Sequence, residues 1–217
     1  MPRSRFFPDP RHADAHGWVC LGDSLETPVL LDAYRHGIFP WPVPGYPVPW
    51  CSPDPRGILP LEKVHISRRL QRTIRSGRFE TSIDRDFRGV ITGCAGMPER
   101  RDEVWITASM IEAYCRLHEE GHAHSVETWQ GGELVGGVYG VAIGRFFAGE
   151  SMFHRATDAS KVALARLIEH LRGQGCLLFD IQMVTAPTAR FGAVEVSRNA
   201  YLDRLAAVMQ VGGRMTF

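Results

Sequence analysis

HSVETWQGGELVGGVYGVAIGRFFAGESMF, residues 124–153, is the stretch of sequence that decides the fold. Its first six residues alternate between polar and apolar, as in a strand with one buried face. Gly131–Gly132 and Gly144 supply turn positions, because glycine adopts positive φ angles without steric cost. The stretch therefore predicts three consecutive antiparallel strands joined by two tight turns.

Helical patterns flank these strands. Residues 108–120 are predicted to form a helix that ends at Gly121, and a second apolar helical stripe runs over 163–171 and closes at 173–175. CLLFDIQMV, residues 176–184, then predicts a further strand. This order predicts an α+β fold with a mostly antiparallel sheet flanked by helices, a layout shared with acyltransferases of the GNAT type.

A proline-rich segment precedes this domain. Residues 40–60 hold eight of the fourteen prolines, two tryptophans and a tyrosine. Proline excludes an interior helix, and the aromatic content is high for a disordered linker, so we expect an extended segment pressed against a protein surface. With a helix around Pro28–His36, it predicts a small N-terminal domain over 1–62, followed by the acyltransferase-like domain over 63–217.

The bulk composition excludes several classes of protein. No run approaches the ~18 apolar residues of a spanning helix, and the first residues are too charged and proline-rich for a signal peptide. We expect a cytoplasmic monomer without membrane contact. The five cysteines are odd in number and never form a CxxC pair, so they are predicted to be reduced thiols.

Two clusters of side chains leave alternatives open. The spacing of Cys115, His118 and His122, with His124 beyond, could suit a metal, but histidines are also favoured near a helix C-terminus, and we expect no metal. Upstream, Ile66, Leu70 and Ile74 predict the buried stripe of another helix. A different face of that helix carries three arginines that are either solvated or contact an RNA backbone: Arg68, Arg72 and Arg75.

The strand 176–184 carries an unusual polar pair. Alternation places Asp180 and Gln182 on one face, whereas Phe179 and Ile181 point to the other. Burying a carboxylate and an amide without partners costs several kcal/mol. The pair is therefore either satisfied structurally or exposed in a cleft.

Glu150 poses the same question on a neighbouring strand. It follows Gly149 and is surrounded in sequence by aromatic and methionine side chains. That setting fits a pocket that takes an apolar group beside a cation, or else a core strand with one charged edge residue.

Ordered motifs over residues 30–205 resemble those of the leucyl/phenylalanyl-tRNA–protein transferases. They are YRHGIFPW (34–41), WCSPDPR (50–56), WIT (105–107), AYCRLHEEGHAHSVETW (113–129), LVGGVYG (134–140), GESMF (149–153), ASK (159–161) and FDIQ (179–182). Cys51 and Arg190–Phe191 depart from the family pattern, which usually has Trp and Ser–Leu there.

The resemblance implies transfer of Leu or Phe, with Met as a further donor, from aminoacyl-tRNA to the N-terminal Arg or Lys of a protein, which marks that protein for degradation by the N-end rule. It also implies a small N-terminal domain and a GNAT-like catalytic domain. By matching motif, Gln182 would hydrogen-bond the attacking amine, Asp180 would polarise Gln182, and Glu150 would lie near the cationic acceptor.

The resemblance also implies how the donor is held. Trp41 and Trp105 would flank the terminal adenosine and the amino-acid side chain, and Arg68, Arg72 and Arg75 would face the tRNA. Further residues expected to bind substrate are Phe147, Met152, Phe153, Tyr34 and Tyr114. An aminoacyl ester is already activated, so no cofactor is expected, and no GxxxxGK[ST] loop is found.

Two other functions remain compatible with the residues. A GNAT N-acetyltransferase would need a [QR]xxGx[GA] turn for acetyl-CoA, and the nearest match, RGQGCL at 172–177, ends in Leu and precedes a strand. A non-catalytic binder of basic N-termini or RNA would use the same polar residues without turnover.

Overall fold

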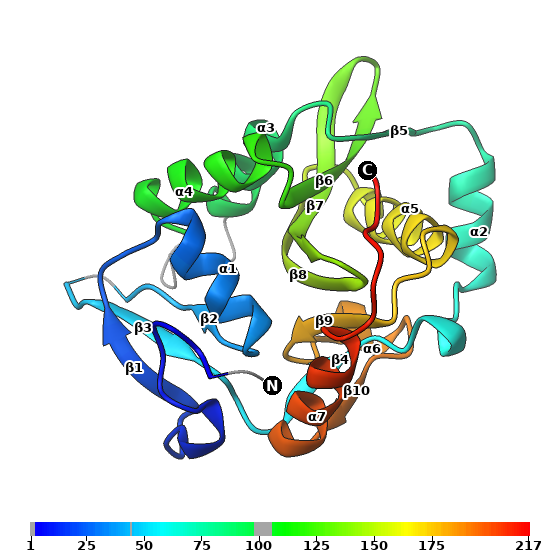
Figure 1. Cartoon of the computed structure of the whole chain (residues 1–217). Coiled ribbons are helices and arrows are strands. Elements are labelled where there is room, and N and C mark those ends of the chain that lie inside the picture. The colour runs from blue at the N-terminus through cyan, green and yellow to red at the C-terminus, as the bar shows by residue number, and fades with distance from the viewer. Residues whose placement is uncertain (1–2, 44, 98–105) are drawn as a thin grey trace.

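The computed structural model describes residues 3–43, 45–97 and 106–217 (Figure 1). Its centre is a seven-stranded sheet in which only β8 and β9 run parallel and every other neighbouring pair is antiparallel. The strand order is β10 (Val194–Val196), β4 (Arg56–Ile58), β9 (Leu178–Gln182), β8 (Phe146–His154), β7 (Glu133–Ile143), β6 (Ala123–Gln130) and β5 (Glu80–Ile83). The three predicted antiparallel strands are confirmed as β6, β7 and β8, and the turn glycines Gly131, Gly132 and Gly144 all have positive φ.

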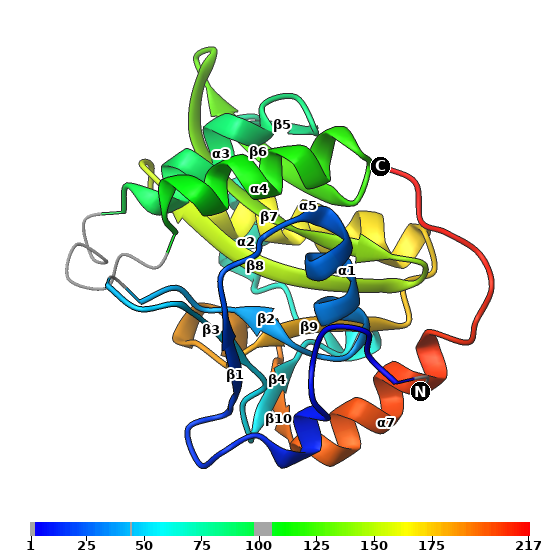
Figure 2. The same cartoon turned by 60° about the vertical axis from the view of Figure 1, so that its left-hand side comes forward.

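Helices cover both faces of this sheet (Figure 2). On one face lie α3 (Phe87–Ala95) and α4 (Ala108–Glu119), and on the other lies α5 (Ala159–Gly173), with α2 (Arg68–Arg75) beside it. The core is accordingly divided into two clusters, one holding the apolar side chains of α3 and α4 and one holding those of α5. The predicted α+β architecture is confirmed.

The N-terminal part forms a separate, smaller sheet. Its strand order is β1 (Trp18–Gly22), β3 (Val48–Cys51) and β2 (Phe39–Pro40), and α1 (Thr27–Arg35) packs beside it. The remaining short elements are η1 (Pro10–His12), η2 (Leu61–Lys63), α6 (Ala186–Ala189) and α7 (Arg198–Val208).

The proline-rich segment is extended, and it links the two sheets. β2 and β3 belong to the small sheet, whereas β4 lies between β10 and β9 of the large one. Trp50 is fully buried with its ring centroid 4.7 Å from that of Phe7. The division of the chain at residues 62 and 63 stays a prediction, and β4, which precedes it, hydrogen-bonds to the larger sheet.

The apolar stripe predicted for α2 is wrong in part. Ser67 caps the helix by accepting the N–H of Leu70, so Ile66 lies before its first turn. Leu70 is buried, but Ile74 remains 40% exposed. Ile66 is partly buried against the same core cluster as Leu70, so the stripe covers the start of the helix and does not extend to Ile74.

Within the described residues, no helix combines the length and the apolar character needed to cross a membrane.

Candidate functional site

The site is built where β8 and β9 run side by side. Ala148 is opposite Asp180 in their parallel register, so Glu150 and Gln182 follow at the same level. On the other side of β8, Gly149 is opposite Gly140 and Ser151 is opposite Tyr139. Glu150 is therefore the extra residue of a β-bulge, a device that turns a side chain out of the regular alternation.

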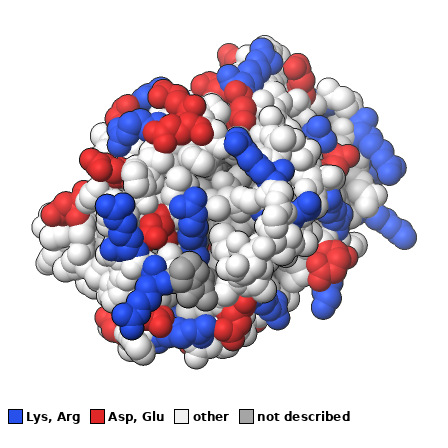
Figure 3. All heavy atoms as spheres, viewed as in Figure 1, with Lys and Arg blue, Asp and Glu red and all other residues white. Residues whose placement is uncertain are grey.

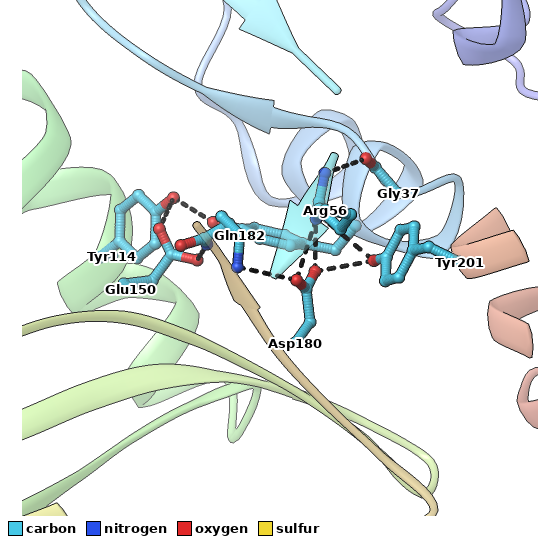
Figure 4. Close-up of polar contacts among 8 residues, drawn as sticks. Gly37, Arg56, Tyr114, Glu150, Asp180, Gln182 and Tyr201 are labelled. Atoms are coloured by element: carbon cyan, nitrogen blue, oxygen red, sulfur yellow. Dashed lines mark hydrogen bonds and ion pairs between the residues drawn. The ribbon is translucent and has the colours of Figure 1, made fainter. Parts of the chain in front are cut away.

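Gln182 ends β9 in an unusual conformation. Its φ of +56° is in the left-handed region, which residues other than glycine rarely adopt. Its Nε2 donates a 2.8 Å hydrogen bond to Oε1 of Glu150 (Figure 4). The amide and the carboxyl group, which are far apart in sequence, thus form one polar centre.

Asp180 is completely buried and its two oxygens are fully engaged (Figure 4). Oδ1 accepts hydrogen bonds from Arg56 Nε and from the backbone N–H of Gln182, each at 2.9 Å. Oδ2 accepts from Arg56 Nη2 at 2.6 Å and from the hydroxyl of Tyr201 at 2.7 Å. The sequence left open whether this carboxylate is satisfied by buried partners or exposed in a cleft, and the structure shows the first of these. The expectation that Asp180 polarises the Gln182 amide is not met directly, because its contact is with the Gln182 backbone.

Arg56 is the residue that sequence reasoning missed. Its side chain is 1% exposed, and its Nη1 donates to the carbonyl of Gly37 at 3.0 Å. The guanidinium carbon lies 4.9 Å from the Phe39 ring centroid and 4.4 Å from that of Tyr201. Arg56 thereby ties the segment after α1 and helix α7 to the end of β9. The available signal was a lone arginine between Pro55 and Gly57, which periodicity does not detect.

Two buried tyrosines from the N-terminal part and from α4 contact Glu150. The hydroxyls of Tyr34 and Tyr114 hydrogen-bond to each other, and Tyr114 donates to Glu150 Oε2 at 3.4 Å. Burial raises the pKa of both phenols well above 10. They are therefore neutral hydrogen-bond donors at any physiological pH.

Glu150 is the titratable group of the site. The pKa of its carboxyl group is raised to about 7, with desolvation by burial as the largest cause and the nearby charge of Asp180 acting in the same direction. Hydrogen bonds with Tyr34 and Gln182 and the charge of Arg56 oppose this increase. Near neutral pH the carboxyl group can thus exist in either protonation state.

The residues predicted to bind substrate are divided between the two faces of the sheet. Phe153 belongs to the core cluster of Tyr34 and Tyr114, and Trp41 is partly buried beside it, with its ring edge-on to Phe39. Phe147 and Met152 instead belong to the cluster under α5, where Phe147 is fully buried. Both therefore lie on the face opposite the tyrosines beside Glu150, Phe147 by the regular alternation of β8 and Met152 because the bulge shifts that alternation. Their role in binding substrate stays a prediction. Trp105 lies outside the described residues.

The four arginines of α2, among them Arg68, Arg72 and Arg75, are exposed, and Lys and Arg side chains gather at the edge of the molecule where α2 lies (Figure 3). Arg68, Arg72 and Arg75 are one helical turn apart and share a face, as predicted. Because α2 packs on α5, these arginines lie on the opposite side of the sheet from Tyr34 and Tyr114, the tyrosines beside Glu150. An RNA contact by these arginines stays a prediction.

Both parts of the chain match sequence models of one protein family. The sequence model of a family described as leucyl/phenylalanyl-tRNA protein transferase matches residues 58–206, and the model of that family's N-terminal domain matches residues 23–54. Curated relatives named leucyl/phenylalanyl-tRNA–protein transferase are 54% identical in Solidesulfovibrio magneticus, over 95% of this chain and 84% of the relative, and 48% identical in Anaeromyxobacter dehalogenans, over 97% and 91%.

Solved structures give weaker matches. A GCN5-related N-acetyltransferase-like protein from Streptococcus suis matches with a TM-score of 0.39 at 15% identity, over 66% of this chain and 57% of that one. The C-terminal domain of a putative lysylphosphatidylglycerol synthetase from Agrobacterium fabrum matches with a TM-score of 0.42 at 10% identity, over 84% and 68%.

Proposed function

Because the chain belongs to the leucyl/phenylalanyl-tRNA–protein transferase family, we propose that it moves Leu or Phe from aminoacyl-tRNA to the N-terminal Arg or Lys of acceptor proteins. The product carries a new peptide bond and an apolar N-terminal residue that serves as a degradation signal. The enzyme acts as a monomer in the cytoplasm.

The reaction is an aminolysis of an ester. The α-amino nitrogen of the acceptor attacks the carbonyl carbon of the aminoacyl ester, a C–N bond forms, and the bond to the 3′-oxygen of the terminal adenosine breaks. The amine loses one proton and the leaving 3′-oxygen gains one. An α-amine with a pKa of ~8 is partly neutral at pH 7, so orientation of the nucleophile supplies much of the rate.

Gln182 positions the attacking amine in this proposal. Its Nε2 is committed to Glu150 at 2.8 Å, so its amide oxygen is the atom that can accept a hydrogen bond from the amine. Amide oxygens are too weakly basic to keep a proton, so Gln182 orients the amine rather than deprotonating it.

Glu150 gives the acceptor site its charge preference. A cationic Arg or Lys side chain near its carboxyl group would favour the ionised form, which the surrounding protein disfavours. The binding of a cationic acceptor and the ionisation of Glu150 are therefore mutually reinforcing. Tyr34 and Tyr114 form the wall behind this carboxyl group.

Asp180, Arg56 and Tyr201 act as positioning residues. Asp180 accepts the Gln182 N–H, and its own place is fixed by Arg56 and Tyr201. This buried network supports the left-handed backbone of Gln182, a conformation that costs free energy unless neighbours hold it.

The aminoacyl-tRNA donor is assigned to two groups of residues. Trp41 and Trp105 are proposed to flank the adenosine and the transferred side chain, and Arg68, Arg72 and Arg75 to contact tRNA phosphates. The arginine contacts should make donor binding weaken steeply with salt.

The Gln182–Glu150 hydrogen bond is the observation that carries the proposal, and acceptor choice tests it. Wild-type protein and Glu150→Gln should be compared with Phe-tRNA and peptides that begin with Arg, Lys, Leu or Asp. We expect the wild type to favour Arg and Lys, and Glu150→Gln to lose much of that preference. Equal use of all four peptides by the wild type would contradict the assigned acceptor.

A further inference from the structure

Asp84, His118 and His124 meet outside the site described above. Asp84 follows β5, His118 lies in the last turn of α4, and His124 is the second residue of β6. His124 Nδ1 is 2.7 Å from Asp84 Oδ2, and His118 Nδ1 is 3.9 Å from Asp84 Oδ1. One potential ligand atom from each residue lies within 4.8 Å of the others.

This set differs from the one suggested by sequence spacing. Of the four residues Cys115, His118, His122 and His124, the fold brings only His118 and His124 together and adds Asp84 from a distant loop. Cys115 is buried with the core side chains of α4. Helical spacing therefore selected His118, His124 lay just beyond the helical set, and Asp84 was not predicted.

Each member of the cluster is held in place by its surroundings. Asp84 has a left-handed φ of +57°, and its Oδ1 accepts the backbone N–H of Ser125 at 2.8 Å. The His118 ring stacks on Phe87 with centroids 4.5 Å apart, and the His124 ring stacks on Phe217 at 3.9 Å. The three groups are thus pre-oriented, which reduces the entropic cost of binding a ligand between them.

We propose that Asp84, His118 and His124 form a binding site for a divalent transition-metal ion, with Zn²⁺ as the best fit. Two imidazoles and one carboxylate suit this class of ion, and a fourth position would be open to water. Ligands ~2.0 Å from a tetrahedral ion are about 3.3 Å apart. The contacts of 2.7 and 3.9 Å, made by different oxygens of Asp84, lie on either side of that value, and one ligand atom from each of the three residues lies within 4.8 Å of the others, so side-chain shifts on the order of 1 Å would close the site.

Binding would exchange two hydrogen bonds for metal bonds. His124 Nδ1 contacts Asp84 Oδ2, and His118 Nδ1 is 2.9 Å from the carbonyl of Ala123. A neutral imidazole can carry its one ring proton on either nitrogen. Transfer of that proton to Nε2 frees the Nδ1 lone pair, and the Asp84 carboxylate offsets part of the ion's charge.

The ion would fasten α4 to β6 and to the loop after β5, one turn from Tyr114 on the same helix. Its expected effect is on stability, because a ligand that binds only the folded chain raises the melting temperature. No step of the transfer reaction passes through it.

The test uses full-length protein without a histidine tag, stripped with a chelator and titrated with ZnCl₂ in a calorimeter. We expect saturation near one ion per chain and a rise of several degrees in Tm at excess zinc. Co²⁺ in place of Zn²⁺ should give the visible absorption bands of a low-symmetry site. A protein that binds no zinc at about 100 µM, with Tm unchanged, would overturn the proposal.

Variants locate the ion. His124→Gln and Asp84→Asn should lose zinc binding and the gain in Tm, and Asn at position 84 can still accept the Ser125 N–H. The neighbouring His122→Gln and Cys115→Ser are the matched controls and should bind as the wild type does. Circular dichroism verifies that each variant is folded. Retained binding in both cluster variants, or equal loss in either control, would refute this ligand set.

Discussion

The guanidinium group of Arg56 lies across both carboxylate oxygens of Asp180, with Nε 2.9 Å from Oδ1 and Nη2 2.6 Å from Oδ2. Neither side chain is more than 1% exposed. Since Asp180 also accepts the N–H of Gln182, this ion pair connects the N-terminal segment, through the Arg56 contact with Gly37, to the proposed active site.

Loss of Arg56 should therefore destabilise the fold. Arg56→Ala leaves the Asp180 charge buried without its partner, and we expect a loss of about 3–5 kcal/mol in the free energy of unfolding. Urea denaturation measures it. Arg166→Ala removes an exposed ion pair with Glu169 and should change stability by no more than about 1 kcal/mol. A loss below 1 kcal/mol for Arg56→Ala would show that Asp180 does not depend on this pair.

Tyr201→Phe tests the positioning role more gently. It removes one buried hydroxyl that donates to Asp180 Oδ2 at 2.7 Å, so we expect a stability loss of about 1–2 kcal/mol. Gln182 should then be held less firmly, and kcat should fall while KM for the acceptor changes little. Tyr46→Phe, at a 70% exposed tyrosine, is the control. Unchanged kcat in Tyr201→Phe would remove this residue from the positioning network.

The raised pKa of Glu150 predicts that the stability difference between the wild type and Glu150→Gln depends on pH. In the unfolded chain its pKa is near 4.5, and in the fold it is about 7, so between these values the native state binds the additional proton. The stabilisation is complete below pH 4.5 and is lost as pH rises through 7. Glu150→Gln has no such loss, so its stability relative to the wild type should increase between pH 4.5 and 7, by at most about 3 kcal/mol.

Urea denaturation of both proteins at several pH values from 4 to 8 checks this. Glu112→Gln is the control for an exposed carboxylate of opposite behaviour, since its hydrogen bond with Arg88 lowers the pKa. Curves for Glu150→Gln and the wild type that run parallel across the range would mean that Glu150 titrates normally.

Gly57 is predicted to tolerate no side chain. It is opposite Gln182 in the sheet, and a Cβ there would lie 2.7 Å from the carbonyl carbon of Met183 and 2.9 Å from the backbone nitrogen of Val184. Gly57→Ala must displace the backbone after Gln182, so we expect a loss of about 1–3 kcal/mol and lower activity.

Gly173→Ala is the matched control for that substitution. A Cβ at position 173 meets no atom within 4 Å, and alanine there should be neutral or stabilise α5 by up to about 1 kcal/mol. Thermal unfolding and transfer rates compare the two variants. Equal effects at both positions would refute the close approach at Gly57.

The sheet could be predicted because its determinants are local. The turn glycines between β6, β7 and β8 and the alternation around Asp180 are properties of neighbouring residues, and the fold confirms them. The helix over 108–120 could be placed because Gly121 terminates it with a φ of +74°.

The environment of the site could not be predicted in this way. Arg56 reaches Asp180 across 124 positions of sequence, and no period or spacing encodes that contact. The bulge at Glu150 shifts the alternation of β8, so Met152 lies on the opposite face from Glu150 although the two residues are an even number of positions apart. Asp84 joins His118 and His124 through tertiary structure alone.

The most direct test of the central claim is mass spectrometry of a peptide beginning with Arg after incubation with Phe-tRNA and the protein. We predict that the wild type adds one phenylalanyl group to the peptide N-terminus, and that folded Gln182→Ala does so on the order of 10²-fold more slowly in single-turnover experiments. Absence of product with folded wild-type protein and intact Phe-tRNA, or an unchanged rate in Gln182→Ala, would contradict a transferase site centred on Gln182 and Glu150.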